Sequence, residues 1–518
     1  MSHDEWMRYW RILKKAKRDR KYGKQFTLVE MHREIGKLKD SAPGIDRVVK
    51  AMLPKKASNL NKLLLYLNKS IFTNDAFDPR LNKTRLQLIP KPDSDKLRPL
   101  GIGLRVGAIM DRLAASRFDV LIHLDPVYRE CYGFKTVVNT EDFFGRMFGI
   151  VEAKKLEGKY VSITQLDVKG AYTSVPHVKL ILAMDAFINR TADPKANRYL
   201  IHFTAKWLEN RTVRFERTEI TMLCGLVQGS PVSPPIFVIF MCYESTSANT
   251  IILKFADDFS QISWAPTPAE LLTEVKTEMK KFETWLDERE MKFEPTKSKF
   301  MLFGRTIGTA KKHFSDVGVE IVDGLRVLGL WITSMLCFHQ HVNKVANKLR
   351  SRVNALRLFK KIGLSIDHAI QFSTCVANSA TYGLWWHAYL SVSDWKRLET
   401  LWTKLLKISV HEKCPRPAIP SKIRDLLGIR DFRSFSDYLV HLRTAGHHTN
   451  PRCARFTLSP QELQEHRNFQ PGTSQPTRSR PSTQQQSAVI AGRREREKAE
   501  KKLGTLKMHS ITVANSHG

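Results

Sequence analysis

The sequence lacks any apolar run long enough to span a membrane, since the longest, at residues 236–242, is far below the roughly 20 residues that a spanning helix needs. It also lacks a secretory signal, because residues 1–21 are basic, carry Asp4 and Glu5, and contain no apolar core. The seven cysteines are odd in number and scattered, which indicates free thiols in a reducing compartment rather than a disulfide framework. We therefore predict an intracellular protein, nuclear or cytoplasmic, that is not secreted and has no membrane segment.

Negative charge is also scarce. The 518-residue chain has 51 Asp and Glu against 84 Lys and Arg, which gives a formal net charge of +33. A polyanion such as nucleic acid is the natural partner of so positive a protein. With 42% hydrophobic residues, a chain of this length can bury two or three cores, so we expect several lobes.

Two adjacent carboxylates, Asp257 and Asp258, follow an apolar run at residues 251–253 that reads as a strand. A tight turn there would place both acids at one tip, although paired acids at a turn are most often simply solvated. Asp167 ends a second β-prone run at residues 160–166. Two strands that end in carboxylates and lie side by side would form a site for divalent cations that bind phosphate oxygens, the arrangement of two-metal phosphoryl transfer.

Two further segments are candidates for contact with a nucleotide. A strand at residues 86–90 enters a turn-rich hairpin with Lys91 and Arg98 at its rim, which is either a flap over a triphosphate or an ordinary exposed hairpin. The loop at residues 225–234 is rich in Gly, Ser and Pro and opens into an apolar helix, so its backbone can approach a ligand closely.

Residues 105–340 alternate helical and strand patterns without internal repeats, which is typical of an α+β core. Helical stripes predict helices at residues 106–118 and 268–293. A third stripe has basic residues around one apolar face, formed by Val342, Ala346, Leu349, Val353 and Leu356. After residue 448 the composition shifts to Pro, Ser, Thr, Gln and Arg, which predicts a disordered tail.

The order and spacing of these pieces resemble one family, the reverse transcriptases, and within it the non-LTR retrotransposon type. The resemblance covers residues 40–335. The segments similar to family motifs are Ala42-Pro43-Gly44-Ile45-Asp46, Leu88-Ile89-Pro90-Lys91 with Arg98-Pro99-Leu100, Tyr132-Gly133-Phe134, Asp167 to Tyr172, Gln228-Gly229-Ser230-Pro231, Phe255-Ala256-Asp257-Asp258, residues 291–303 around Lys297, and Leu328-Gly329. The resemblance implies an α+β right-hand polymerase with fingers, a palm built on an antiparallel sheet, and a helical thumb.

The same resemblance divides the chain into four parts. These are a basic N-terminal extension at 1–40, the fingers and palm at 41–335, a helical thumb and post-polymerase region at 336–447, and a disordered basic tail at 448–518. Since only residues 1–40 precede the fingers and no nuclease constellation follows them, we expect target cutting to come from a separate endonuclease.

The resemblance also assigns roles to residues. Asp167 and Asp257 would hold two Mg²⁺ ions, with Mn²⁺ as an alternative, and Asp258 would support them. Nucleotide binding would fall to Lys91, Arg98, Tyr172, Gln228, Gly229 and Lys297. The primer grip would be Leu328 and Gly329.

Three of the nucleotide-binding roles have a physical rationale and an ordinary alternative. Arg98 offers a bidentate fork to triphosphate oxygens. Tyr172, five residues after Asp167, would stand where a ribose 2′-hydroxyl must fit and so select deoxynucleotides, or else it is a core aromatic. Lys297 would assist protonation of pyrophosphate, or else it is a solvated loop charge.

The implied activity is an RNA-directed DNA polymerase that adds dNTPs to a DNA or RNA primer on an RNA template. The sequence departs from the family pattern at Val227, where proline is usual, at Glu294, where asparagine is usual, and at residues 135–139, which replace a more basic block. These departures leave a decayed or repurposed copy open. Two alternatives remain, an RNA-dependent RNA polymerase, which usually has a smaller polar residue at the position of Tyr172, and a catalytically silent RNA-binding protein, against which the three intact acids argue.

Overall fold

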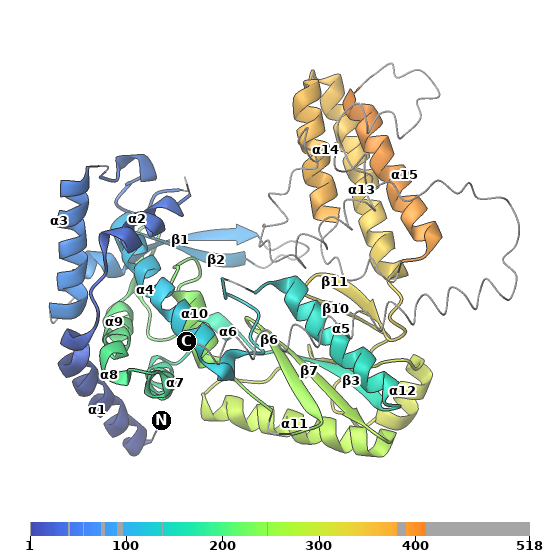
Figure 1. Ribbon diagram of the computed structural model, residues 1–518, viewed down its shortest axis with the longest axis horizontal. Helices are drawn as coiled ribbons and strands as arrows, with labels where there is room; N and C mark the ends of the chain where they lie inside the picture. Colours follow the sequence, from blue (N-terminus) through green and yellow to red (C-terminus); the bar gives the residue numbers. More distant parts are fainter. Residues whose placement is uncertain are drawn as a thin grey trace, which may run out of the picture. The chain divides into compact units, whose positions relative to one another are not determined.

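The computed structural model describes residues 2–39, 42–54, 56–73, 78–90, 97–136, 138–245, 247–380 and 390–410 (Figure 1). None of the helices in these ranges combines the length and the apolar character that a membrane span requires. The predictions made for Lys91, for residues 411–447 and for the tail at 448–518 lie outside the described residues.

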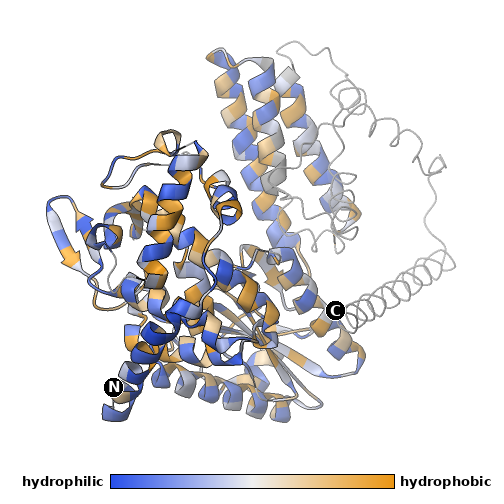
Figure 2. Cartoon of the chain, turned by 60° about the vertical axis from the view of Figure 1, so that its left-hand side comes forward, coloured by the Kyte–Doolittle hydropathy of each residue, from blue (hydrophilic) through white to orange (hydrophobic). Residues whose placement is uncertain are grey.

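The N-terminal helices are α1 (His3–Asp19), α2 (Leu28–Gly36) and α3 (Ala57–Asn68). Capping boxes start two of them: the Ser2 hydroxyl accepts from the Glu5 N–H while the Glu5 carboxylate accepts from the Ser2 N–H, and Thr27 and Glu30 repeat the exchange in α2. Figure 2 shows that the helix beside the N-terminus is mostly hydrophilic on the side in view. Short helical turns follow at Arg20–Tyr22, Lys50–Met52, Lys69–Thr73, Pro79–Asn82 and, further on, Pro126–Tyr128.

A four-stranded sheet has the order β2-β1-β4-β5. Its strands are β1 (Lys83–Pro90), β2 (Leu97–Gly103), β4 (Thr212–Phe215) and β5 (Thr218–Thr221). β1 and β2 form the predicted antiparallel hairpin, and β1 also pairs in parallel with β4. The helix after β2, α4 (Arg105–Leu124), extends the one predicted at 106–118.

A five-stranded sheet has the order β6-β7-β3-β8-β9. Its strands are β3 (Tyr160–Leu166), β6 (Thr250–Phe255), β7 (Asp258–Ala265), β8 (Lys299–Leu302) and β9 (Glu320–Ile321). The pairing is antiparallel except between β8 and β9. This sheet holds both acid-ending strands that the sequence predicts.

Two hydrophobic cores lie on opposite faces of this sheet because strand side chains alternate. Ile163 and Ile262 join a core with helix α5 (Thr140–Leu156). Phe259 and Phe300 join the other core, with helix α11 (Pro268–Glu288).

α11 is shorter than the helix predicted at 268–293. Glu290 has a φ of 57°, a left-handed conformation that a helix cannot contain, so the chain leaves the helix after Glu288. The next residues instead approach β3, where Phe293 forms a bridge with Val168.

The remaining elements complete the connections around the two sheets. They are α6 (Ala171–Ser174), α7 (His177–Arg190), α8 (Pro194–Asn197), α9 (Tyr199–Leu208), α10 (Ser233–Phe240), α12 (Ile307–Phe314), β10 (Gly324–Val327) and β11 (Leu330–Thr333).

Three helices follow, α13 (His339–Lys361), α14 (Ile366–Ala380) and α15 (Val392–Val410), and they pack against one another. The five apolar residues predicted to share one face of α13 are all buried. The exposed basic residues around it include Lys344, Lys348, Arg350, Arg352 and Arg357. The amphipathic helix predicted here is therefore confirmed, and its basic face is open to solvent.

Candidate active site

The turn between β6 and β7 carries two of the three predicted catalytic acids. Phe255 pairs with Asp258, so the connection consists of Ala256 and Asp257 alone. Ala256 has a φ of 60°, which a residue with a Cβ rarely adopts, so the surrounding structure must stabilise this turn.

The third acid, Asp167, directly follows β3. Leu166 pairs with Phe259, and continuing this antiparallel register by one residue puts Asp167 opposite Asp258. Neighbouring strands lie about 4.8 Å apart. The three carboxylates therefore share one end of the sheet, as the sequence predicts.

The segment after α11 fixes the backbone of Asp167. The Asp167 N–H donates to Ser298 Oγ at 3.0 Å, and the Asp167 carbonyl accepts from the Glu294 N–H at 3.0 Å. The Ser298 hydroxyl in turn donates to the Glu294 carbonyl at 3.0 Å. This bracing holds Lys297, which lies between Glu294 and Ser298, beside the acids.

The electrostatics of the site are those of crowded carboxylates. The pKa of Asp258 is raised to about 6, because protein removes water around it and because Asp257 and Asp167 carry like charges, although part of its side chain stays exposed. Burial also raises the pKa of Asp167, while Lys297, whose Nζ lies 3.6 Å from Asp167 Oδ2, opposes that shift. The same Nζ lies 3.6 Å from Glu294 Oε2.

This donor set fits Mg²⁺, because a divalent cation offsets the like charges and prefers oxygen ligands. Among the residues that the structure describes, no three His, Cys, Asp or Glu side chains converge as a complete metal centre. Mg²⁺ commonly binds through one or two carboxylates, waters and substrate phosphates, so a site that substrate completes needs no such cluster.

Tyr172 lies beside these acids. Its ring stacks on Phe237 at a centroid distance of 4.3 Å and meets Phe134 edge to face at 6.2 Å. Burial, and then the charge of Asp257, raise the pKa of its hydroxyl. That hydroxyl is buried and makes no hydrogen bond to the described residues.

The Gly-rich loop rests directly on β2. The Gly101 N–H donates to the Gln228 carbonyl at 2.6 Å. Gly229 has a φ of +111°, and a Cβ there would meet the Gly101 carbonyl oxygen at 2.6 Å, so only glycine fits. Arg98 is exposed on β2, opposite Ile89 of β1.

Gly133 supports the acidic turn by direct contact. A Cβ on Gly133 would lie 2.4 Å from the Ala256 nitrogen. The adjacent chain pairs with β6, since the Tyr132 N–H donates to the Lys254 carbonyl at 2.7 Å and the Lys254 N–H to the Glu130 carbonyl at 2.8 Å. Sequence reasoning placed Gly133 in a motif but missed this supporting role.

Leu328 and Gly329 form the two-residue turn between β10 and β11, where Val327 pairs with Leu330. Both have positive φ, 45° for Leu328 and 91° for Gly329. A two-residue hairpin turn in which both residues have positive φ has a twist that matches the right-handed twist of its strands. Glycine adopts positive φ readily, so Gly329 favours this turn. The turn lies in a separate two-stranded sheet beside β8.

Residues 89–332 match the family described as "Reverse transcriptase (RNA-dependent DNA polymerase)". The chain contains a reverse transcriptase domain. This family is described as one of RNA-dependent DNA polymerases, which are nucleotidyltransferases, so the match supports the predicted enzyme class, and the predicted α+β fold class is confirmed.

Three solved structures similar to the chain are telomerases. They are the apo telomerase of Candida tropicalis truncated from its C-terminal domain (13% identity, TM-score 0.38, covering 50% of this chain and 55% of that one), the telomerase of Candida albicans in complex with a fragment of telomeric RNA (11%, 0.41, 66% and 66%), and the apo telomerase of Candida tropicalis (12%, 0.41, 65% and 57%). The chain thus spans less than two thirds of the length of these proteins. No curated protein matches the sequence significantly.

The reverse transcriptase domain brings most of the predicted residues into two groups. Asp167, Asp257 and Asp258 gather at the sheet end with Lys297, and Tyr172 lies close enough to Asp257 for its charge to act on the hydroxyl. Gln228 and Gly229 join the second group, on the β2 strand that carries Arg98.

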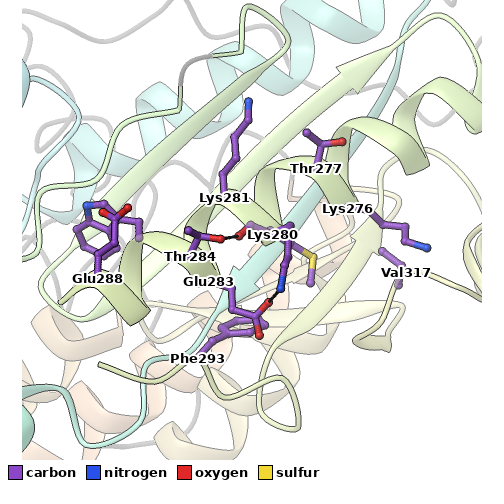
Figure 3. Close-up of a pocket in the computed structure, with 11 residues that line it drawn as sticks. Lys276, Thr277, Lys280, Lys281, Glu283, Thr284, Glu288, Phe293 and Val317 are labelled. Atoms are coloured by element: carbon purple, nitrogen blue, oxygen red, sulfur yellow. Dashed lines mark hydrogen bonds and ion pairs between the residues drawn. The ribbon is translucent and has the colours of Figure 1, made fainter. Parts of the chain in front are cut away.

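A groove of about 780 Å³ lies elsewhere in the domain, along α11 (Figure 3). Its lining includes Trp285, Phe293 and Val317, and none of the predicted site residues. Lys280 in this groove is already paired with Glu283 at 2.8 Å. The groove is therefore separate from the acidic site, which lies at an open end of the sheet.

Proposed function

We propose that the chain is an RNA-directed DNA polymerase of the non-LTR retrotransposon type, which adds dNTPs to a primer 3′-hydroxyl on an RNA template. The observation that carries this proposal is the position of Asp167, Asp257 and Asp258 side by side at one end of the sheet in a reverse transcriptase domain. The non-LTR type is supported by the order and spacing of the motifs along the chain.

The metal ligands would be Asp167 and Asp257, with Asp258 in support. Two Mg²⁺ ions, or Mn²⁺, would lower the pKa of the attacking hydroxyl and neutralise the leaving pyrophosphate. Asp258 suits a supporting role, because its raised pKa reflects burial and the like charges of Asp257 and Asp167, which a nearby cation would offset.

The incoming nucleotide would bind between the acids and the loop on β2. Arg98, exposed on the hairpin, would hold triphosphate oxygens together with Lys91, which lies outside the described residues. Gln228 and Gly229 would line the nucleotide, since their backbone is fixed on β2 and Gly229 has no side chain to block an approach.

Tyr172 would select the sugar. Its ring is held by the stack on Phe237, so a 2′-hydroxyl that meets it cannot displace it cheaply. The absence of a hydrogen-bond partner for the Tyr172 hydroxyl among the described residues fits a side chain that faces a ligand rather than a packed core.

Lys297 would donate a proton to the leaving pyrophosphate. Its ammonium lies 3.6 Å from a carboxylate of the metal site and keeps 58% of its side-chain surface exposed, so it can reach a ligand bound there.

The larger division of the chain follows the same proposal. Residues 41–335 would form fingers and palm, 336–447 the thumb region, 1–40 a basic extension and 448–518 a basic tail. Leu328 and Gly329 would contact the primer end, and the basic face of α13 would follow the backbone of template and primer. A separate endonuclease would cut the target, and the protein would act in the nucleus or cytoplasm.

Primer extension tests the proposal. Wild-type protein is given an RNA template, a DNA primer, dNTPs and Mg²⁺, and is compared with Asp257→Ala and with the control Asp316→Ala. Asp316 is an exposed acid paired with Lys276 at 2.7 Å, outside the site. We expect extension by wild type and by the control, and none by Asp257→Ala.

Other outcomes would point to the alternatives. Equal or better extension with NTPs would indicate an RNA-dependent RNA polymerase. A folded wild-type protein that binds template and primer but extends nothing would indicate a silent RNA-binding protein.

A further inference from the structure

Two charged residues that the reaction does not use are buried beneath the Gly-rich loop. Asp111 comes from α4 and is 7% exposed, while Arg211 lies between α9 and β4 and is 4% exposed. Burying charges is costly unless they are paired and hydrogen-bonded, so both positions need an explanation.

Asp111 holds the loop itself. The Ser230 hydroxyl, one residue after Gly229, donates to Asp111 Oδ2 at 2.5 Å. Burial raises the pKa of Asp111, and the charge of Arg211 and the Ser230 hydroxyl oppose that shift. The carboxylate is thus placed between a fixed cation and the loop.

Arg211 makes hydrogen bonds to α9 and to the start of β1. Its Nε donates to the Trp207 carbonyl at 2.8 Å, and its guanidinium lies 3.9 Å from the centre of the Trp207 ring. Its two terminal nitrogens donate to Thr84 Oγ1 at 3.3 Å and to Asn82 Oδ1 at 3.4 Å, at the start of β1. Burial lowers its pKa to about 10, so it stays cationic at neutral pH.

A cavity of about 30 Å³ lies among these groups, with Asp111, Arg211, Gly101, Gly229 and Ser230 in its wall. That volume has room for a water molecule. Above it, the hydrogen bond from Gly101 to the Gln228 carbonyl clamps the loop to β2. The loop is therefore attached twice, to β2 through its backbone and to the buried pair through Ser230.

We propose that Asp111 and Arg211 are positioning residues. They hold the Gln228-Gly229-Ser230 loop in place relative to β2 and thereby determine how well the incoming nucleotide fits against it. The inference rests on the proposed function of this loop. It predicts an effect on nucleotide binding that is larger than any effect on binding of template and primer, which the pair does not touch.

The test compares Ser230→Ala and Asp111→Asn with the control Glu278→Gln. Glu278 is also buried and accepts a hydrogen bond from a serine hydroxyl, Ser245, at 2.6 Å, but it belongs to α11. Ser230→Ala removes only the hydroxyl, so it remains informative if Asp111→Asn fails to fold.

We expect both loop variants to raise the KM for dNTP about tenfold with kcat changed less, the signature of lost ground-state binding. The double variant should be less than additive, because both changes act on the contact between Ser230 and Asp111. Affinity for template and primer should stay at the wild-type value, and Glu278→Gln should leave the KM unchanged.

Hydrogen exchange at the backbone N–H of Gly101, which donates to the Gln228 carbonyl, and of residue 230, which donates to the Val227 carbonyl at 3.3 Å, provides a readout that needs no polymerase activity. We expect faster exchange there in both loop variants and not in Glu278→Gln. A wild-type protein without polymerase activity would contradict the proposed function. Hydrogen exchange alone would then test whether Asp111 and Arg211 position the loop. Exchange and KM that stay at wild-type values in Ser230→Ala, or that change equally in Glu278→Gln, would overturn it.

Discussion

At the residue scale, the choice between dNTP and NTP is expected to depend on one ring. Replacing Tyr172 by Ala removes the ring that stacks on Phe237 and opens space beside Asp257. We expect Tyr172→Ala to incorporate NTPs and to lose about 10- to 100-fold of sugar discrimination, where each tenfold corresponds to about 1.4 kcal/mol. The measurement is kcat/KM for a dNTP and for the matching NTP.

Tyr172→Phe is the control for this prediction, because it keeps the ring and removes only the hydroxyl. It should discriminate as wild type does. Unchanged discrimination in Tyr172→Ala would instead make this residue a packing aromatic.

A second residue-scale prediction concerns Gly133. A Cβ there would lie 2.4 Å from the Ala256 nitrogen, so Gly133→Ala must displace the turn that carries Asp257. Because small misplacements of catalytic groups are costly, we expect primer extension to fall by about 100-fold with little change in melting temperature.

Gly149→Ala is the matched control, since a Cβ at Gly149 meets nothing within 4 Å and the residue lies within α5. It should keep full activity. Equal activity in both variants would show that the turn does not depend on Gly133.

The sequence predicted the positions of the acids better than the contacts that hold the surrounding loops in place. Asp167 and Asp257 each follow an apolar β-prone run, a local pattern that survives folding. The role of Gly133 depends on a backbone contact with Ala256, far along the chain, and no local pattern encodes such a contact. The contact between Asp111 and Ser230 escaped prediction for the same reason.

At the element scale, periodicity predicted helices well and their ends poorly. The apolar stripe of α13 is buried as expected, because a period of 3.6 residues maps one face directly. The end of α11 was misplaced by several residues, since the stripe continues through Phe293 while the backbone already turns at Glu290.

The junction of α13 with β11 gives an element-scale prediction about pH. His341 Nδ1 accepts from the Trp331 N–H at 3.4 Å, and burial, with the charge of Lys344, lowers the His341 pKa to about 4. Above pH 6.5 the imidazole is neutral in both folded and unfolded chains. Below pH 6.5, His341 binds a proton in the unfolded chain but not yet in the folded chain. The free energy of unfolding therefore falls as the pH falls toward 4.

We expect this residue to remove about 2 kcal/mol of stability between pH 6.5 and 5.0. The measurement is the difference in urea unfolding between wild type and His341→Gln, which keeps an acceptor but does not titrate. The difference should change in favour of the variant as the pH falls. A difference that is constant with pH would place a charged or exposed imidazole at this junction.

At the scale of the whole molecule, the charge of +33 makes binding to nucleic acid sensitive to salt. Each phosphate neutralised by a Lys or Arg releases condensed counterions, so the logarithm of affinity falls linearly with the logarithm of salt concentration. Lys348 and Arg352 are exposed one turn apart on α13 and therefore point to the same side. If α13 follows the backbone of template and primer, both side chains contribute to that slope.

We expect Lys348→Gln with Arg352→Gln to weaken binding of a template–primer duplex similarly for unrelated sequences and to reduce the salt slope by about 2, one for each lost contact. Lys280→Gln on α11 is the control, because it removes an exposed cation that is already paired with Glu283. A slope reduced equally by the control would assign the effect to net charge alone. A slope reduced only by the α13 variant would locate the duplex on this helix, because the control also lowers the total charge, by one where the α13 variant lowers it by two.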